Sequence, residues 1–297
     1  MNVKSLLRSL TPPLLYNALH LARMRLAPTT EYAIGGHVIQ IPADHNLPAF
    51  QGVHRLYDRF LPVLCSKLAP AGVIVDVGEN VGDTVAAIMH ACSNRIIAIE
   101  GHEAYFNLLT ANLERIDPER RVTPVQALVG TGLQSGTLVA TRGTATLAGG
   151  GSTRLRKLDD ILAGSIDKIA LLKVDTDGFD ADVISSGIRM IKESQPILFW
   201  EGGTSGAIAF ESMYEKIARV GYDMFWIFDN FGNLILSECS IKELKDFDRY
   251  IASMYRHRCT TAIYYVDVLA STSKTICQAR EAIVRYRAEF IEIALLK

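Results

Sequence analysis

The chain has 297 residues, of which 49% are hydrophobic, and its formal net charge is −1 with a sequence pI near 6.7. This apolar content is enough for the core of one large or two small domains, and it excludes a predominantly disordered chain. The nearly balanced charge excludes the broadly basic surface with which many proteins bind nucleic acid. The substrate must therefore be inferred from local motifs.

The cysteines are scattered through the chain, and no two of them form a C-x-x-C pair: Cys65, Cys92, Cys239, Cys259 and Cys277. Their odd number and apolar surroundings predict reduced thiols in a cytoplasmic protein, without a disulfide framework or a zinc site. The sequence contains no run of about 18 apolar residues and so predicts no transmembrane helix.

The first 28 residues are basic, because no acid precedes Glu31 and four cationic side chains do: Lys4, Arg8, Arg23 and Arg25. Arg8 and the pair Pro12–Pro13 interrupt the apolar residues, which argues against a secretory signal peptide. Two interpretations stay open. The segment forms an amphipathic helix in peripheral contact with the inner face of the membrane, or it forms a helix that packs on the catalytic domain.

Residues 1–69 are expected to form an extension, or lid, in front of the main domain. Gly35–Pro42 is typical of a strand in a hairpin, and Phe50–Leu68 has apolar residues at helical spacing. Three histidines in this extension, His37, His45 and His54, are candidates for lining an acceptor pocket. The absence of a partner motif favours solvent-facing or capping roles for them.

The most informative stretch begins at Val73–Val77, an apolar and β-branched run that predicts a strand buried on both faces of a parallel sheet. Gly78 and Gly82 then allow a sharp turn and a close approach of backbone N–H groups to a ligand. A helix is predicted over Thr84–Cys92. Its N-terminus would point at the pocket.

The spacing of this turn differs from the dinucleotide fingerprint G-x-G-x-x-G, because Asn80 takes the middle glycine position and the final gap is shorter. This departure disfavours a dehydrogenase. Asn is the residue other than glycine that best adopts a left-handed backbone, so the turn can still form. Glu100 ends the next strand, Arg95–Glu100, 22 residues after Gly78. That offset is typical of a carboxylate that binds ribose hydroxyls.

The remaining pattern alternates helices and strands, and the predicted helices are 103–115, 180–194, 210–220, 241–255 and 274–296. The predicted strands are 121–128, 169–174, 196–200, 222–228 and 259–268, with a turn at 229–232. A Gly- and Thr-rich excursion spans 132–151 and contains two short candidate strands, 136–140 and 144–148. Loops of this length tend to be functional. Arg142 and Arg154, at its edges, are candidates for contacting an anionic acceptor.

Three ordered blocks carry a family resemblance: Asp76–Thr84 with Glu100, then Leu158–Asp160 with Leu171–Gly187, and finally Pro196–Glu201. They resemble the FkbM family of S-adenosylmethionine (SAM) dependent methyltransferases. The resemblance implies an α/β, Rossmann-like class I methyltransferase fold over residues 70–297, with a seven-stranded, mostly parallel sheet flanked by helices. SAM is the implied cofactor. The implied cofactor residues are Asp76, Gly78, Glu79, Asn80, Gly82, Asp83, Thr84, Glu100, Gly101, Ala127 and Leu128.

Methylation of an alcohol needs a base, and a carboxylate at the end of a sheet strand is the available type. Asp175 is the leading candidate, with Asp177 and Glu201 second. Asp177 and Asp180 stand where the family usually has Glu, so each has a shorter reach. No metal site is predicted, although the three carboxylates are of a type that suits Mg²⁺ or Ca²⁺.

The resemblance implies O-methylation of a hydroxyl on a sugar, glycan or natural-product acceptor, with no nucleic-acid partner. Three alternatives stay open. They are a non-catalytic methyltransferase-like scaffold in glycan assembly, an NAD-binding Rossmann enzyme, and a methyltransferase for a lipid or other small-molecule acceptor. Fold alone does not decide among them. The oligomeric state is not predicted.

Overall fold

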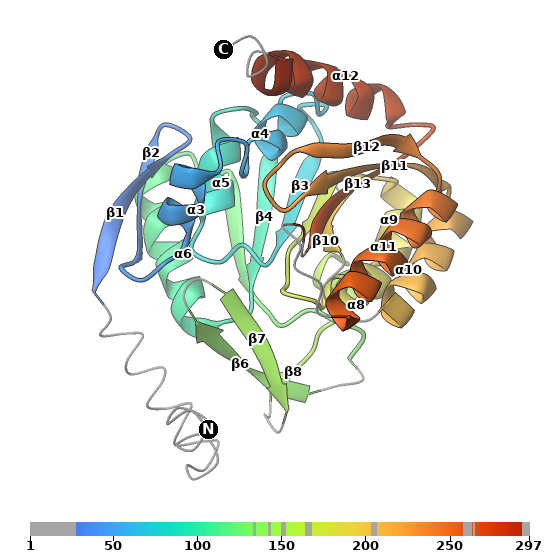
Figure 1. The fold of residues 1–297 in the computed structure, drawn as a ribbon. Coiled ribbons are helices and arrows are strands. Elements are labelled where there is room, and N and C mark those ends of the chain that lie inside the picture. Colours follow the sequence, from blue (N-terminus) through green and yellow to red (C-terminus); the bar gives the residue numbers. More distant parts are fainter. Residues whose placement is uncertain are drawn as a thin grey trace.

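A computed structural model describes residues 28–132, 135–141, 144–149, 153–163, 168–202, 207–257, 263 and 265–292. Its main element is an eight-stranded mixed sheet with the order β12-β11-β13-β10-β9-β3-β4-β5 (Figure 1). Five neighbouring strands, β10 to β5 in this order, pair in parallel, whereas β13 runs antiparallel to both of its neighbours. This arrangement confirms the expected α/β class I methyltransferase fold.

The strands of this sheet are β3 (Val73–Val77), β4 (Arg95–Glu100), β5 (Val122–Gln126), β9 (Ile169–Val174), β10 (Ile197–Gly202), β11 (Tyr222–Asp229), β12 (Leu234–Cys239) and β13 (Val266–Thr272). All five residues of β3 are buried, as the apolar run predicts for a central parallel strand. The fold therefore places the turn after β3 at the middle of the sheet.

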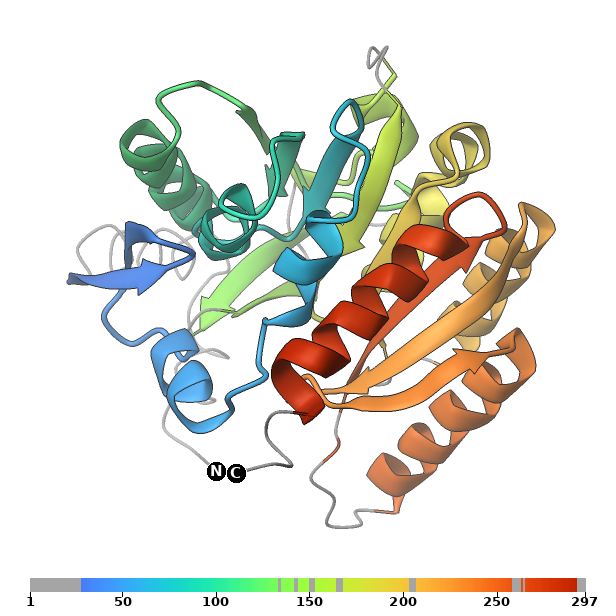
Figure 2. The same cartoon turned by 90° about the horizontal axis from the view of Figure 1, so that it is seen from above.

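Two layers of helices cover the sheet, and the views in Figures 1 and 2 agree on their sides. One layer contains α4 (Phe60–Cys65), α5 (Asp83–Met89), α6 (Glu103–Ile116) and α12 (Ile276–Tyr286), which continues into the π-helical turn η1 (Arg287–Glu292). The other contains α7 (Leu158–Ile161), α8 (Asp180–Ser186), α9 (Ile188–Ser194), α10 (Ala207–Arg219) and α11 (Ile241–Arg256). A core cluster fills each side of the sheet.

Alternation along the strands assigns each side chain to one of these two sides. In β3, Ile74 belongs to the core beneath α4 and α5, whereas Val75 belongs to the core beneath α8 to α11. Asp76 shares the side of Ile74. By the same alternation Lys173 shares the side of Leu171, and Asp76 and Lys173 are register partners.

The N-terminal extension begins with a hairpin, β1 (Thr29–Ile34) and β2 (His37–Pro42), followed by α3 (Leu47–Val53). Asn112 on α6 joins this hairpin to the main domain. Its Oδ1 accepts the N–H of Gln40 at 2.7 Å, and its Nδ2 donates to the carbonyls of Gln40 and Val81, each at 2.8 Å. Because Val81 lies in the turn after β3, one buried amide fixes the hairpin and the turn together.

A separate three-stranded sheet stands apart from the main one in Figure 1: β6 (Ser135–Thr141), β7 (Thr144–Gly149) and β8 (Thr153–Arg154). Its hairpin confirms the two short strands expected in the Gly- and Thr-rich excursion. Arg154 is exposed, and Arg142 lies outside the described residues.

Most element ends shift by a few residues from the expected ranges, and larger differences concern one strand, one helix and the start of the last strand. β12 is an additional edge strand, formed because the chain turns at 229–232 and pairs back on β11, so the sheet has eight strands instead of seven. The expected helix over 180–194 is interrupted at Gly187, where the Leu158 side chain packs so closely that a Cβ would lie 2.8 Å from its Cδ2. The last strand is β13, starting at Val266, whereas we expected it to start at Cys259, which lies outside the described residues.

Within the described residues, no helix is both long and apolar enough to cross a membrane. The basic segment over residues 1–27, for which we left two interpretations open, lies outside the described part of the chain.

The Asn112 contacts lead to a stability prediction. Asn112→Ala removes three hydrogen bonds from buried or half-buried backbone groups, so we expect the free energy of unfolding to fall by about 2–4 kcal/mol in urea denaturation. Asn107→Ala, at an exposed position of the same helix, is the matched control and should change it by less than about 0.5 kcal/mol. Equal effects of the two variants would contradict this account of the hairpin.

Candidate active site

The turn after β3 is shaped by three residues with positive φ. Gly78 has φ +88°, Asn80 has φ +60°, and Gly82 has φ +95° at the start of α5. Asn80 therefore adopts the left-handed backbone that its sequence position predicted. A Cβ on Gly78 would lie 1.8 Å from the carbonyl oxygen of Asp175, so only glycine allows the turn to approach the end of β9 this closely.

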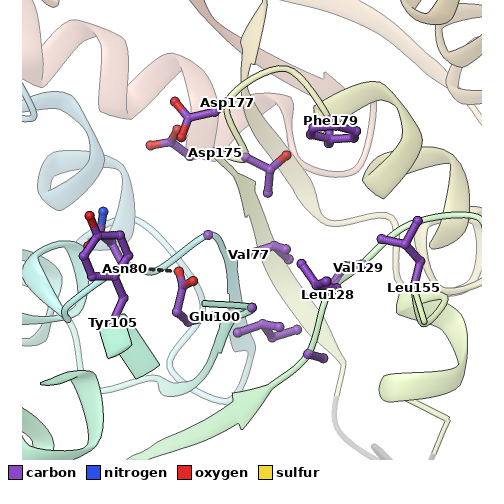
Figure 3. A pocket seen from close by; sticks show the side chains of 15 residues that line it. Val77, Asn80, Glu100, Tyr105, Leu128, Val129, Leu155, Asp175, Asp177 and Phe179 are labelled. Atoms are coloured by element: carbon purple, nitrogen blue, oxygen red, sulfur yellow. Dashed lines mark hydrogen bonds between the residues drawn. The ribbon is translucent and has the colours of Figure 1, made fainter. Parts of the chain in front are cut away.

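A first cavity of about 610 Å³ opens beside this turn, between the carboxyl ends of β3, β4 and β9. Figure 3 shows its polar side chains on one side and its apolar side chains on the other. The polar side holds Asn80, Glu100, Asp175 and Asp177, with Tyr105 next to Asn80, and the apolar side holds Leu128, Val129, Leu155 and Phe179. Gly78, Gly101 and Ala127 complete the predicted residues that line it.

Glu100 is held firmly at the floor of this cavity. One carboxylate oxygen accepts the N–H of Asn80 at 2.9 Å, and the other accepts the N–H of His102 at 2.6 Å. Burial raises the pKa of Glu100 to about 7, against the opposing effect of these backbone hydrogen bonds. A carboxylate oxygen has more than one lone pair, so both oxygens can still accept hydrogen bonds from a ligand's hydroxyl groups.

Two predicted cofactor residues lie beneath the turn. Glu79 is fully buried, and its Oε1 accepts the N–H of Val85 in the first turn of α5 at 2.8 Å. Burial, followed by the neighbouring Asp76, raises the pKa of Glu79 well above its usual range. Asp76 is also fully buried and is absent from the lining of both cavities formed by the described residues. Asp76 therefore supports the turn from below, whereas Glu79 supports it and also lines the second cavity described below.

Lys173 was not predicted from the sequence, and it connects the turn to the candidate base. Its Nζ lies 3.0 Å from Oδ1 of Asp76 and 3.5 Å from Oδ2 of Asp175. Burial alone would lower the pKa of Lys173, but Asp76 and then Asp175 raise it well above its usual range. The lysine is thus a fixed cation between a fully buried carboxylate and a half-exposed one.

A second cavity, of about 1720 Å³, lies on the same side of the sheet as Lys173 and beneath the N-terminal extension. Its lining shares Gly78, Asn80, Asp175 and Asp177 with the first cavity. Four residues of the predicted set line only this second cavity, together with His45: Glu79, Asp83, Thr84 and Glu201. Asp175 therefore stands where the two cavities meet.

The walls of the second cavity also hold acids that sequence reasoning missed. Asp267 begins β13 and is the register partner of Glu201, and Asp58 extends from the connection between α3 and α4 with φ +59°. Strand alternation could have identified Asp267. It lies two residues before Leu269 and so projects from the same side of β13, toward the core beneath α4 and α5. The sequence gives no comparable signal for Asp58, which lies in the connection between α3 and α4.

The three carboxylates proposed for catalysis, Asp175, Asp177 and Glu201, all line the second cavity. No group of three or more His, Cys, Asp or Glu side chains within the described residues has the geometry to hold a metal ion. Gly82 is the N-cap of α5 and lines neither of these two cavities. The exposed Arg154 lines neither of them either.

Strand order and the position of the cavity define a class I methyltransferase-like domain, in which the ligand site lies at the carboxyl edge of the central strands. The model of the methyltransferase FkbM domain matches residues 76–224, just over half of the chain. The chain belongs to the FkbM methyltransferase family.

Solved structures with related folds have low sequence identity to this chain. One is methyltransferase FkbM from Methylobacillus flagellatus KT, at 17% identity and TM-score 0.38, covering 76% of this chain and 58% of that one. The METTL16 MTase domain matches at 12% identity and TM-score 0.45, covering 86% of this chain and 78% of that one. Cofactor-bound Rv0187 from MTB matches at 13% identity and TM-score 0.42, covering 91% and 95%. No curated protein matches the sequence.

Asp180 supplies a pH-dependent stability prediction. Burial raises its pKa to about 8, with a further contribution from Asp175, whereas an unfolded Asp titrates near about 4. The protonated form stabilises the fold, so this contribution is complete below about pH 4 and is lost as the pH rises through about 8. Between pH 5 and 8 the wild type should lose up to about 1.4 kcal/mol per pH unit more than Asp180→Asn in urea denaturation.

The matched control for this measurement is Asp223→Asn, because Asp223 is exposed on β11. It should follow the wild-type pH profile. Parallel profiles for Asp180→Asn and the wild type would contradict a buried, proton-holding Asp180.

Proposed function

We propose that this FkbM-family methyltransferase transfers the methyl group of SAM to a hydroxyl of a sugar, glycan or natural-product acceptor. The observation that carries the proposal is the position of Asp175 at the junction of two cavities. The smaller cavity suits a nucleoside, and the larger one has room for an acceptor. A carboxylate at their junction is placed to take a proton from the attacking hydroxyl.

The residues of the first cavity fit SAM. The glycine-dependent approach of the turn to Asp175 leaves a backbone cradle that a Cβ would fill, and Glu100 presents a fixed carboxylate of the kind that binds a ribose diol. Leu128, Val129 and Leu155 form an apolar surface of the kind that accommodates a flat purine. We assign cofactor binding to this cavity.

When bound, SAM supplies a methyl group already activated by its sulfonium. The main task of the protein is then to orient the acceptor oxygen and exclude water. Lys173 fixes the Asp175 carboxylate through the ion pair at 3.5 Å, so that its second oxygen remains available on the half-exposed side. In this proposal Asp175 takes the proton from the hydroxyl. Asp177 and Glu201, which line the same cavity, orient the acceptor.

The acceptor side favours a molecule with apolar ring faces and several hydroxyl groups. Six aromatic side chains line the second cavity alongside its carboxylates: Phe50, Tyr57, Phe60, Phe199, Phe228 and Tyr265. Aromatic faces pack against the C–H faces of sugar rings, and carboxylates accept their hydroxyl protons. We propose a cytoplasmic enzyme that acts on a glycan or related intermediate and makes peripheral membrane contact through residues 1–28.

Cofactor identity can be tested by calorimetric titration of the purified protein with SAM and with NAD. We expect SAM to bind and NAD to give no heat, because the turn departs from the dinucleotide spacing. Glu100→Gln replaces a charged acceptor by a neutral one and should weaken SAM binding about tenfold or more. Binding of NAD in place of SAM would support the dehydrogenase alternative, and undiminished SAM binding by Glu100→Gln would remove Glu100 from the site.

The assigned base leads to a kinetic prediction. Asp175→Asn preserves size but cannot take a proton, so turnover should fall by about 10²–10⁴-fold while SAM affinity changes by less than about threefold. Turnover is followed as transfer of labelled methyl from SAM to a glycoside panel and to cell-envelope extract. Asp223→Asn is the control and should match the wild type. Full turnover by Asp175→Asn would exclude the assignment, and no transfer by the wild type to any acceptor would favour a scaffold.

A further inference from the structure

The wall of the second cavity that faces away from the first is lined by three carboxyl groups from three different segments. Glu201 and Asp267 are register partners on β10 and β13, and Asp58 comes from the extension that covers them. All three line the second cavity and are absent from the lining of the first. A ligand confined to the first cavity would not touch these three carboxyl groups, so SAM held there would not supply their counter-charge.

No cation of the described residues neutralises this distal wall. Lys173 also lines the cavity, but its ammonium is held by Asp76 at 3.0 Å and Asp175 at 3.5 Å. The other candidate is His45, whose Nδ1 accepts the N–H of Leu47 at 3.2 Å and is thereby occupied within its own segment. Among the described side chains, no Lys, Arg or His lies within ion-pair distance of Asp58, Glu201 or Asp267.

Two of these carboxyl groups are consequently destabilised as anions, because burial raises the pKa values of Glu201 and Asp267 well above their usual range. Asp58 is more exposed, and its Oδ2 accepts a hydrogen bond from Nε2 of Gln51 at 3.4 Å. The charged groups that face the three carboxyl groups are Asp83, Asp175, Asp177, Asp180 and Lys173, of which only the lysine favours their ionisation. A cation that entered this space would favour the ionised carboxylates and release protons.

The other residues that line the cavity indicate which kind of cation it can accept. Tyr57 and Tyr265 are among the aromatic residues that line the cavity. Aromatic faces attract an ammonium group electrostatically and also pack against sugar rings. An anionic acceptor would instead meet several carboxylates, and a small inorganic ion would leave the aromatic part of the lining without a contact.

We propose that the acceptor is a polyhydroxylated ring that carries a protonated amine, and that Asp58, Glu201 and Asp267 bind its ammonium group. An amino sugar or an aminocyclitol has this chemistry. The ammonium at the distal wall directs a ring hydroxyl toward Asp175 at the junction with the cofactor cavity. This inference rests on the function proposed above, since it assigns the second cavity to the acceptor.

The probes for testing it are the methyl α-glycosides of glucosamine, glucose and glucuronic acid. Each is titrated by calorimetry into the full-length protein loaded with S-adenosylhomocysteine, the product form of the cofactor, in two buffers of different protonation enthalpy. The glucosaminide should bind about tenfold or more tightly than the glucoside, with net proton release, and the glucuronide should not bind. An equal or tighter affinity for the glucoside, or no detectable binding of the glucosaminide, overturns the proposal.

Two variants, each replacing one carboxylate by a neutral amide, test which residues produce the preference for the glucosaminide over the glucoside. Asp267→Asn and Asp58→Asn should each reduce the preference for the glucosaminide to about threefold or less, while the affinity for the glucoside stays the same. Asp58 lies in an exposed connection, so Asp58→Asn remains informative if Asp267→Asn fails to fold. Asp223→Asn, exposed and at the opposite end of β11, should retain the full preference. A preference that survives both variants of the distal wall overturns the assignment.

A magnesium titration in the absence of glycoside separates a metal site from an ammonium site. Stoichiometric Mg²⁺ binding that is lost in Asp267→Asn would mean that the carboxylates hold a metal, and it overturns the proposal. Labelled methyl transfer distinguishes this failure from failure of the proposed function. Selective glucosaminide binding without methyl transfer to any acceptor contradicts the proposed function alone, whereas methyl transfer to neutral or acidic glycosides in preference contradicts the amine inference alone.

Discussion

The candidate site depends on the two ion pairs that the buried ammonium of Lys173 forms. The ammonium joins Asp76 of β3 to Asp175 at the end of β9 through contacts of 3.0 and 3.5 Å. The same two strands meet where the carbonyl of Asp175 fills the space that a side chain on Gly78 would need. A change at Lys173 would leave Asp76 as a buried charge without compensation. The position of the candidate base and the shape of the cofactor turn are therefore set by one lysine.

Those parts of the fold that depend on residues close together in the sequence could be predicted from it. The apolar run of β3, the two glycines and the following helix form one continuous local pattern, and the structure reproduces it with Asn80 at φ +60°. Glu100 follows from its position at the end of the next strand, and the structure places it in the first cavity. Short-range patterns of this kind specify both the fold class and the cofactor side.

The acceptor side could be predicted only in part, because it is assembled from segments far apart in the chain. Asp58 and Asp267 are separated by about two thirds of the sequence, and neither lies in a motif. Glu201 was predicted from its motif, but its partner across β13 depends on an antiparallel register that periodicity cannot reveal. For the same reason β12 was missed, since its pairing requires the neighbouring strand as a template. Similarly, the break at Gly187 reflects the packing of Leu158 from another helix.

The amide of Asn112 has a consequence for how the enzyme responds to its ligands. Because this one side chain bonds both the hairpin and the turn that borders the cofactor cavity, ordering of either segment favours ordering of the other. Linkage of this kind is reciprocal. Binding of a ligand in the first cavity would therefore favour an ordered hairpin, and an ordered hairpin would favour binding of that ligand to the same extent.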